Sequence, residues 1–268
     1  MLIFFQNIIW QVRCALALIL HEFFWRMRIL ILIQFTKRNR LGKVLRQLYT
    51  DGVAVIPNYY SNEEISLIDQ YCSMAMKESV NKPDNEISIS RRGGSIRLKQ
   101  LQKDYPIMKR FSEDIFIMLI NFAFSFRMSF PSLIYSVTDS KDYNSVTKKE
   151  AKYLFGVAYH TDTYSHQLKA IIFLEDVKPE NGATSYCPKS SGIHWSQFNY
   201  FLFKYKLSED KRNKNNTFRR SIEKSHRNRS YDDKEFLEPE YCEKIMAKNK
   251  AQLMTENQGS LVLFDTRT

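Results

Sequence analysis

The segment from Tyr159 to His194 limits the possible folds of this chain more than any other, because it places three of the five histidines among strand-like residues. His160 and Asp162 lie two residues apart and follow the apolar, β-prone run LFGVAY. Side chains at this spacing on an extended backbone project to the same face. We therefore expect the imidazole and the carboxylate to converge on one point.

The residues that follow predict a sheet. LKAIIFLEDV has the pattern of a buried strand that ends near Pro179, and Glu180-Asn181-Gly182 has the composition of a turn. ATSYC is a second short strand, and PKSSGIH is a loop. A strand with polar side chains, followed by a long apolar strand and a tight turn, is typical of a jelly-roll barrel.

The His160–Asp162 pair is open to two interpretations. An imidazole and a carboxylate on one face are two of the three ligands of the 2-His-1-carboxylate triad, which holds Fe(II) and leaves coordination positions open. A single His-x-Asp also arises by chance, so the pair alone does not establish a metal site.

The order of these motifs resembles the phytanoyl-CoA dioxygenase family of Fe(II)- and 2-oxoglutarate-dependent oxygenases. HTD, the strand IIFLEDV, the turn ENGAT and the loop CPKSSGIH are similar to that family's HxD, its aliphatic strand, its NG turn and its Pro-x-Ser-x-His loop. Upstream, DGVAVIPN and SNEEI resemble its opening strand and helix start, and GSLVLFDTRT resembles the strand that leads into its second metal histidine. The resemblance covers residues 41–268 in ordered pieces.

The resemblance implies a mainly β fold with flanking helices, a double-stranded β-helix or jelly roll. It implies a dioxygenase that uses Fe(II) and 2-oxoglutarate, hydroxylates a small or lipid-like substrate, and decarboxylates 2-oxoglutarate to succinate. His160 and Asp162 would be the metal ligands and the catalytic residues. Asp162 favours hydroxylation over halogenation, because related halogenases lack this carboxylate.

Four further residues are weaker candidates for the site. Tyr159 and Tyr164 flank the pair and could line a substrate pocket, although packing in the core or on the barrel surface is as good an explanation. Thr184 and Arg267 could contact the cofactor. Arg267 precedes the position where the second histidine is expected, whereas the family's carboxylate-binding arginine follows it.

The sequence departs from the family pattern after GSLVLFDTRT. The second metal histidine and the 2-oxoglutarate arginine are expected beyond Thr268, so the chain resembles a copy truncated before them, or one whose third ligand comes from elsewhere. His166 and His194 are poor substitutes, because a triad needs convergent geometry. The alternative function is therefore a truncated, catalytically inactive member that acts as a binding or structural module.

Residues 1–36 are strongly apolar, but Arg13, Glu22, Arg26 and Arg28 interrupt them. No uncharged run reaches the roughly 18 to 20 residues of a membrane span, and no cleavage site of a signal peptide is evident. Three interpretations stay open: a helix packed on the barrel, a segment that associates with a membrane surface, and a start codon assigned too far upstream.

The polar run from Thr36 to Arg40 predicts a boundary between an N-terminal segment, residues 1–40, and an oxygenase domain, residues 41–268. Forty basic and 29 acidic residues give a net charge of +11, which favours anionic partners, including an anionic small-molecule substrate. No zinc-finger, RRM or helix-turn-helix signature predicts specific nucleic-acid binding.

The four cysteines, Cys14, Cys72, Cys187 and Cys242, are far apart in the sequence. This spacing is typical of reduced thiols in a cytoplasmic protein, one that could also lie at the periphery of a membrane.

Local patterns predict the remaining elements. Ser61 and Glu64 form a capping box for a helix, and Gly52 ends the helix before it. Residues 81–94 are predicted to be a polar loop and residues 195–257 a helical and loop insertion. Further predicted elements are strands at 53–57, 132–137 and 259–266 and a helix within 113–130.

Overall fold

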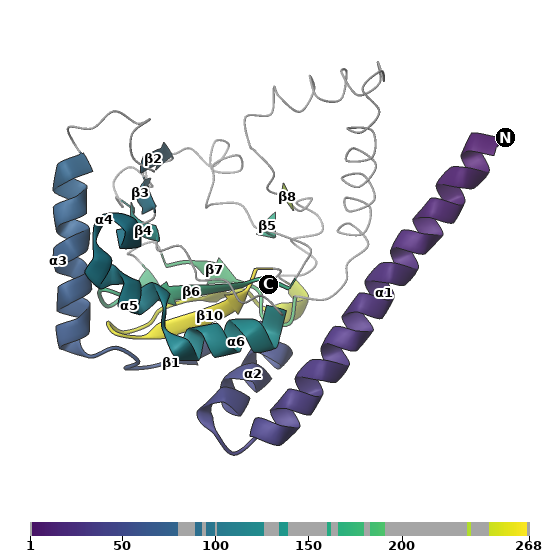
Figure 1. Ribbon diagram of the computed structural model, residues 1–268, viewed down its shortest axis with the longest axis horizontal. Helices are drawn as coiled ribbons and strands as arrows, with labels where there is room; N and C mark the ends of the chain where they lie inside the picture. The colour runs from purple at the N-terminus through teal and green to yellow at the C-terminus, as the bar shows by residue number, and fades with distance from the viewer. Residues whose placement is uncertain are drawn as a thin grey trace.

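The computed structural model describes residues 2–79, 89–92, 95–99, 101–125, 134–138, 160–161, 166–179, 183–190, 235–236 and 247–266. Its principal helices are α1 (Leu2–Thr36), α2 (Arg40–Asp51), α3 (Asn62–Ser79) and α6 (Ile115–Ser125) (Figure 1). Two shorter helices, α4 (Leu101–Asp104) and α5 (Lys109–Ser112), flank the 3-10 turn η1 (Pro106–Met108).

Three strands that are distant in sequence form the central antiparallel sheet, in the order β1 (Val53–Ile56), β10 (Leu261–Asp265), β6 (Leu168–Ile172). Val53 pairs with Phe264 on one side of β10, and Asp265 pairs with Leu168 on the other. β10 is therefore the middle strand, and it is buried on both faces. Leu261 and Leu263 enter one hydrophobic cluster and Val262 enters another, as the two-residue period of a strand requires.

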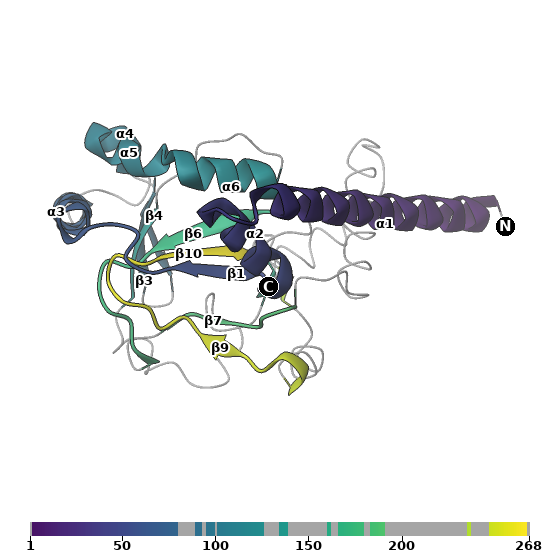
Figure 2. The same cartoon turned by 90° about the horizontal axis from the view of Figure 1, so that it is seen from below.

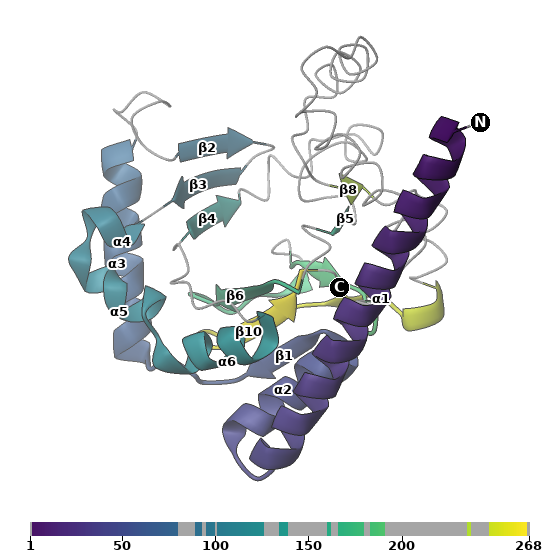
Figure 3. The ribbon, with the colours of Figure 1, turned by 45° about the vertical axis from the view of Figure 1, so that its right-hand side comes forward.

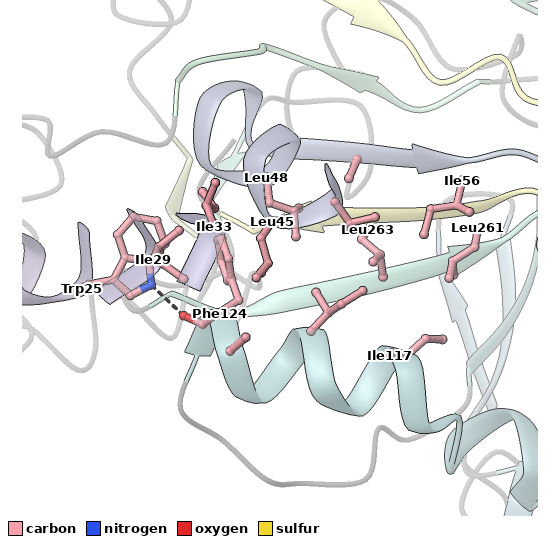
Figure 4. Packing of buried hydrophobic residues seen from close by; sticks show 14 residues of the cluster. Trp25, Ile29, Ile33, Leu45, Leu48, Ile56, Ile117, Phe124, Leu261 and Leu263 are labelled. Atoms are coloured by element: carbon pink, nitrogen blue, oxygen red, sulfur yellow. Dashed lines mark hydrogen bonds between the residues drawn. The ribbon is translucent and has the colours of Figure 1, made fainter. Parts of the chain in front are cut away.

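Helices α1, α2 and α6 cover one face of this sheet, as Figure 2 shows. Trp25, Ile29 and Ile33 of α1 pack with Leu45 of α2 and Phe124 of α6 (Figure 4). These three buried α1 positions are four residues apart, which places them on one side of the helix. The C-terminal half of α1 is thus part of the core.

Local sequence signals account for the ends of α2 and α3. The side chain of Asn39 accepts a hydrogen bond from the Gly42 amide at the start of α2, and Gly52 ends this helix in the left-handed region at φ 78°. Ser61 and Glu64 exchange hydrogen bonds of 3.0 and 3.3 Å, so the predicted capping box is confirmed.

A second antiparallel sheet consists of β2 (Ile89–Arg92), β3 (Ser95–Lys99) and β4 (Ile134–Thr138) and lies beside α3, as Figure 3 shows. Leu98 of β3 packs against Ile65 and Cys72 of α3. The predicted loop at 81–94 is wrong for residues 89–92, because these residues pair with β3. The polar composition of residues 81–94 predicted a loop, whereas residues 89–92 form a strand by pairing with β3, the segment that follows them.

Two further strand pairs are short. β5 (His160–Thr161) pairs with β8 (Glu235–Phe236), and β7 (Ser185–Tyr186) pairs with β9 (Gln252–Leu253). The described residues therefore form antiparallel sheets with helices packed on them, in agreement with the coarse fold prediction, and they do not trace a closed jelly roll. Within this described part, no helix combines the length and the apolar character needed to cross a membrane.

Candidate functional site

The predicted ligand strand is present in part as β5. His160 pairs with Phe236 and Thr161 pairs with Glu235. Asp162 lies outside the described residues. The extended backbone at His160 agrees with the sequence analysis, and the convergence of His160 with Asp162 stays a prediction. The other candidates outside the described residues are Tyr159, Tyr164, His194 and Arg267.

The end of β10 lies beside the start of β6. Asp265 is paired with Leu168, and the Thr266 amide donates a 3.0 Å hydrogen bond to the Gln167 carbonyl. The strand GSLVLFDT therefore ends next to the residues that follow the His160–Asp162 pair. The pairing brings together two segments that the sequence separates by about a hundred residues.

A buried polar cluster occupies this junction, and we name it the junction cluster: Glu22, His166 and Asp265. The three residues are 8%, 4% and 1% exposed. The His166 Nε2 atom lies 2.9 Å from Glu22 Oε2, and its Nδ1 atom lies 3.9 Å from Asp265 Oδ2. One imidazole thus stands between a carboxylate of α1 and a carboxylate of the central strand.

Aromatic packing fixes the His166 ring. The Trp25 ring stacks on it at a centroid distance of 3.6 Å and an interplanar angle of 11°. The Trp25 indole N–H donates to the Phe124 carbonyl at 2.6 Å, and the Arg28 guanidinium donates to the same oxygen at 2.9 Å. The last carbonyls of a helix have no hydrogen-bond donor within that helix. Trp25 and Arg28 of α1 therefore supply the donors for the Phe124 carbonyl near the end of α6. Burial lowers the pKa of Arg28 below its usual range.

The chemistry of the junction cluster is that of a buried hydrogen-bonded contact. Glu22 also accepts a 2.9 Å hydrogen bond from Arg26, in addition to its contact with His166. His166 has one nitrogen against Glu22 and a face covered by Trp25. Within the described ranges, no group of three or more His, Cys, Asp or Glu side chains has an arrangement that could hold a metal ion. His160 and Asp162 have the nitrogen and oxygen donors that Fe(II) takes, and the pair stays a predicted ligand set because Asp162 lies outside the described residues.

The segment around β7 is fixed through its backbone. The Met254 amide donates to the Thr184 carbonyl at 2.8 Å, and the Lys189 amide donates to the Asp51 carbonyl at 3.0 Å. The Ser190 hydroxyl donates to the Cys187 carbonyl at 2.7 Å, which closes the first turn of the PKSSGIH loop. The Thr184 side chain is exposed, and its contact with a cofactor stays a prediction.

Two cysteines, Cys72 and Cys187, are free and buried. Burial, together with the nearby Asp69 carboxylate, raises the pKa of the Cys72 thiol to about 12. Such a thiol is neutral at physiological pH and a poor nucleophile, so it belongs to the core and not to a reactive site.

The comparisons with known proteins leave the family open. Neither the protein-family models nor the curated proteins contain a match to this chain. A solved structure of the epimerase SnoN in complex with Fe³⁺, alpha ketoglutarate and nogalamycin RO is similar at a TM-score of 0.48 and 12% identity. The match covers 85% of this chain and 74% of that one. A likeness of this size assigns neither fold nor function.

Sequence reasoning missed the junction cluster. It treated Glu22 as an interruption of an apolar helix and His166 as a poor metal ligand with no other role. A useful signal was present, because a single acidic residue within an apolar helix is either exposed or paired when buried. The partner could not be identified, since Glu22 and His166 are 144 residues apart.

Proposed function

We propose that this chain is an Fe(II)- and 2-oxoglutarate-dependent dioxygenase domain of the phytanoyl-CoA dioxygenase type, with a jelly-roll fold. The observation that carries the proposal is the order β1–β10–β6. The segments DGVAVIPN, GSLVLFDTRT and IIFLEDV each resemble a separate part of the family pattern, and they contribute residues to β1, β10 and β6, three neighbouring strands of one sheet. Motifs assembled by chance have no reason to be neighbours in space.

In this proposal His160 and Asp162 supply one nitrogen and one oxygen ligand to the metal. The third protein ligand is expected after β10, whose end lies beside the start of β6. Tyr159 and Tyr164 would contact a small or lipid-like substrate, and Thr184 and Arg267 would contact 2-oxoglutarate. With both groups bound, O2 would be the oxidant: one of its oxygen atoms would enter succinate as 2-oxoglutarate loses CO2, and the other would be available to hydroxylate the substrate.

The test uses the chain as printed and a variant extended at Thr268 by a segment that contains a histidine. Each is mixed with Fe(II) and 2-oxoglutarate without oxygen, and the charge-transfer absorption is recorded. Oxygen is then admitted and succinate is measured. We expect both signals in at least one of the two proteins.

The control variants separate the predicted ligands from other imidazoles. His160→Ala and Asp162→Ala should each abolish the absorption and the succinate, whereas His226→Ala, which lies outside the predicted site, should preserve both. If the two ligand variants keep both signals, the assignment of His160 and Asp162 as metal ligands is wrong. Absence of both signals in the printed and the extended chain would favour the alternative, a binding or structural module.

A further inference from the structure

We propose that the outward side of α1 is a docking surface for a membrane that contains anionic lipid. The helix has two unlike sides. Its inner side holds Trp25, Ile29 and Ile33 against the core. Its outer side carries large apolar side chains that are at least 45% exposed, among them Ile19, Phe23, Phe24, Met27, Ile31 and Phe35.

The exposed residues of α1 are mostly apolar. Among the described side chains from Leu16 to Phe35, nine exposed residues are apolar and three are polar, namely His21, Arg26 and Gln34. Phe35 is 86% exposed. This stripe runs along about 30 Å of helix at 1.5 Å per residue. Monomeric soluble proteins rarely expose a continuous apolar patch larger than roughly 300–600 Å². Large apolar side chains exposed along about 30 Å of helix therefore indicate that this side of α1 binds a partner.

Helix α6 also carries exposed apolar side chains. Ile115, Leu119 and Phe122 are exposed and lie four and three residues apart, which places them on one side of α6. Figures 2 and 3 show α6 and α1 along the same side of the described structure. Trp25 and Phe124 join the two helices through a hydrogen bond, so their relative position is fixed. We name the exposed side of α1 and these three α6 residues the apolar face.

The charges beside the α1 part of the apolar face are mostly positive, whereas Glu113 is exposed beside Ile115 at the α6 part. Residues 1–50 contain eight lysine and arginine residues and one acidic residue, Glu22, which is buried against His166. Lys37, Arg38 and Lys43 are exposed in the turn that follows Phe35 and at the start of α2. Binding to the surface of an anionic membrane requires exposed cations beside exposed apolar side chains. The cations contact the lipid headgroups, and the apolar side chains enter the boundary of the acyl chains.

Charge also favours lipid over a second copy of this chain. Two copies joined at the apolar face would bring together two chains of net charge +11, and like charges repel. An anionic surface attracts the same charges, by a factor of roughly fivefold in affinity per lysine or arginine near it. The occupant that fits both the apolar side chains and the cations is therefore the surface of an anionic bilayer. This inference does not depend on the oxygenase proposal.

The test is flotation of the full chain with vesicles of phosphatidylcholine alone and with vesicles that contain about one-third phosphatidylserine. We expect flotation with the anionic vesicles, weaker flotation with the neutral ones, and a decrease as salt screens the charges. Lys37→Gln combined with Arg38→Gln should weaken binding to anionic vesicles by roughly 25-fold and leave binding to neutral vesicles unchanged.

The apolar contribution is tested with Phe23→Glu combined with Phe35→Glu. Both side chains are exposed, so folding should be retained, and circular dichroism and the unfolding midpoint verify this. Flotation should be lost. The matched control is Met74→Glu combined with Leu253→Glu, two exposed apolar residues on α3 and β9, which should float as the unchanged chain does.

Three outcomes would overturn the proposal: no flotation of the unchanged chain with anionic vesicles, equal flotation of the Phe23/Phe35 variant, or a loss that the Met74/Leu253 control shares. Light scattering identifies the competing occupant. A dimer that the Phe23/Phe35 substitutions dissociate, without any vesicle binding, would assign the apolar face to a second copy.

Discussion

At the scale of single residues, His166 determines how α1 is attached to the sheet. Its imidazole meets Glu22 at 2.9 Å and lies flat against Trp25. Removal of one partner from a buried hydrogen bond leaves the other polar group less well satisfied in the core, which costs more than the bond contributes as a whole. The junction cluster is therefore a sensitive point of the fold even if it takes no part in chemistry.

We expect His166→Ala to lower the free energy of unfolding by about 3 kcal/mol, because it removes a buried hydrogen-bond partner of Glu22 and leaves a cavity where the ring packed against Trp25. Urea unfolding followed by Trp fluorescence measures the change. Arg26→Ala is the matched control, since Arg26 contacts the same carboxylate from the exposed side and should cost less than about 1 kcal/mol. Equal losses in the two variants would show that burial of the imidazole contributes nothing.

Asp114 is a second residue whose side chain joins several elements through hydrogen bonds. Its carboxylate accepts hydrogen bonds from the Tyr59 hydroxyl at 2.9 Å, from the Tyr60 hydroxyl at 3.2 Å, and from the Ile117 amide in the first turn of α6. Burial, and after it the Asp114 charge, raises the pKa of both tyrosines above the ordinary value near 10. The two hydroxyls thus stay protonated in the folded protein to higher pH than in the unfolded chain.

A pKa raised by folding contributes stability that is complete below the unfolded value, near pH 10, and is lost as the pH rises through the folded value. We therefore expect the free energy of unfolding to fall above about pH 10. Asp114→Asn retains a cap for α6 but removes the charge, so stability at neutral pH should drop by about 1 kcal/mol and the alkaline fall should become shallower. Absorbance of tyrosinate against pH, with urea unfolding at each pH, measures both; an unchanged alkaline slope would exclude Asp114 as a cause.

At the scale of elements, the turn between α1 and α2 sets the angle at which the long helix leaves the core. A Cβ atom on Gly42 would lie 2.1 Å from the Thr36 carbonyl oxygen, a distance at which the backbone must move. The close approach of the two helices thus depends on the missing side chain. Because the outer side of α1 is positioned by this turn, the apolar face depends on Gly42 as well.

We expect Gly42→Ala to lower the free energy of unfolding by about 2 kcal/mol or more, since the helix gain of alanine is outweighed by the clash. Lys43→Ala, the next and exposed position of α2, should change it by less than about 0.5 kcal/mol. Thermal unfolding measures both, and protection of the α1 amides from hydrogen exchange should fall only in the Gly42 variant. A neutral Gly42→Ala would mean that the turn opens without cost.

At the scale of the whole molecule, the sequence predicted what short segments determine by themselves. The capping box of Ser61 and Glu64, the end of α2 at Gly52 and the strand-like run GSLVLFDT need only neighbours in sequence. The junction cluster and the strand order β1–β10–β6 depend on pairing between distant segments, for which a single sequence carries no local signal. The same holds for the candidate site. The extended backbone at His160 could be predicted from its neighbours in sequence, whereas the contact of His166 depends on Glu22 of α1, 144 residues away.

The strand order also determines where the molecule is most sensitive to mutation. β10 is the middle strand of the central sheet and comes late in the sequence, so β1 and β6 stay without their shared partner until residues 261–265 have been made. Leu263 is fully buried between β1, β6 and the helices. We expect Leu263→Ala to lower the free energy of unfolding of the protein by about 2–5 kcal/mol and to slow refolding. Leu253→Ala on β9, 46% exposed, should change it by less than about 0.5 kcal/mol. Urea unfolding and refolding rates measure the difference; equal effects of the two substitutions would contradict a core organised around β10.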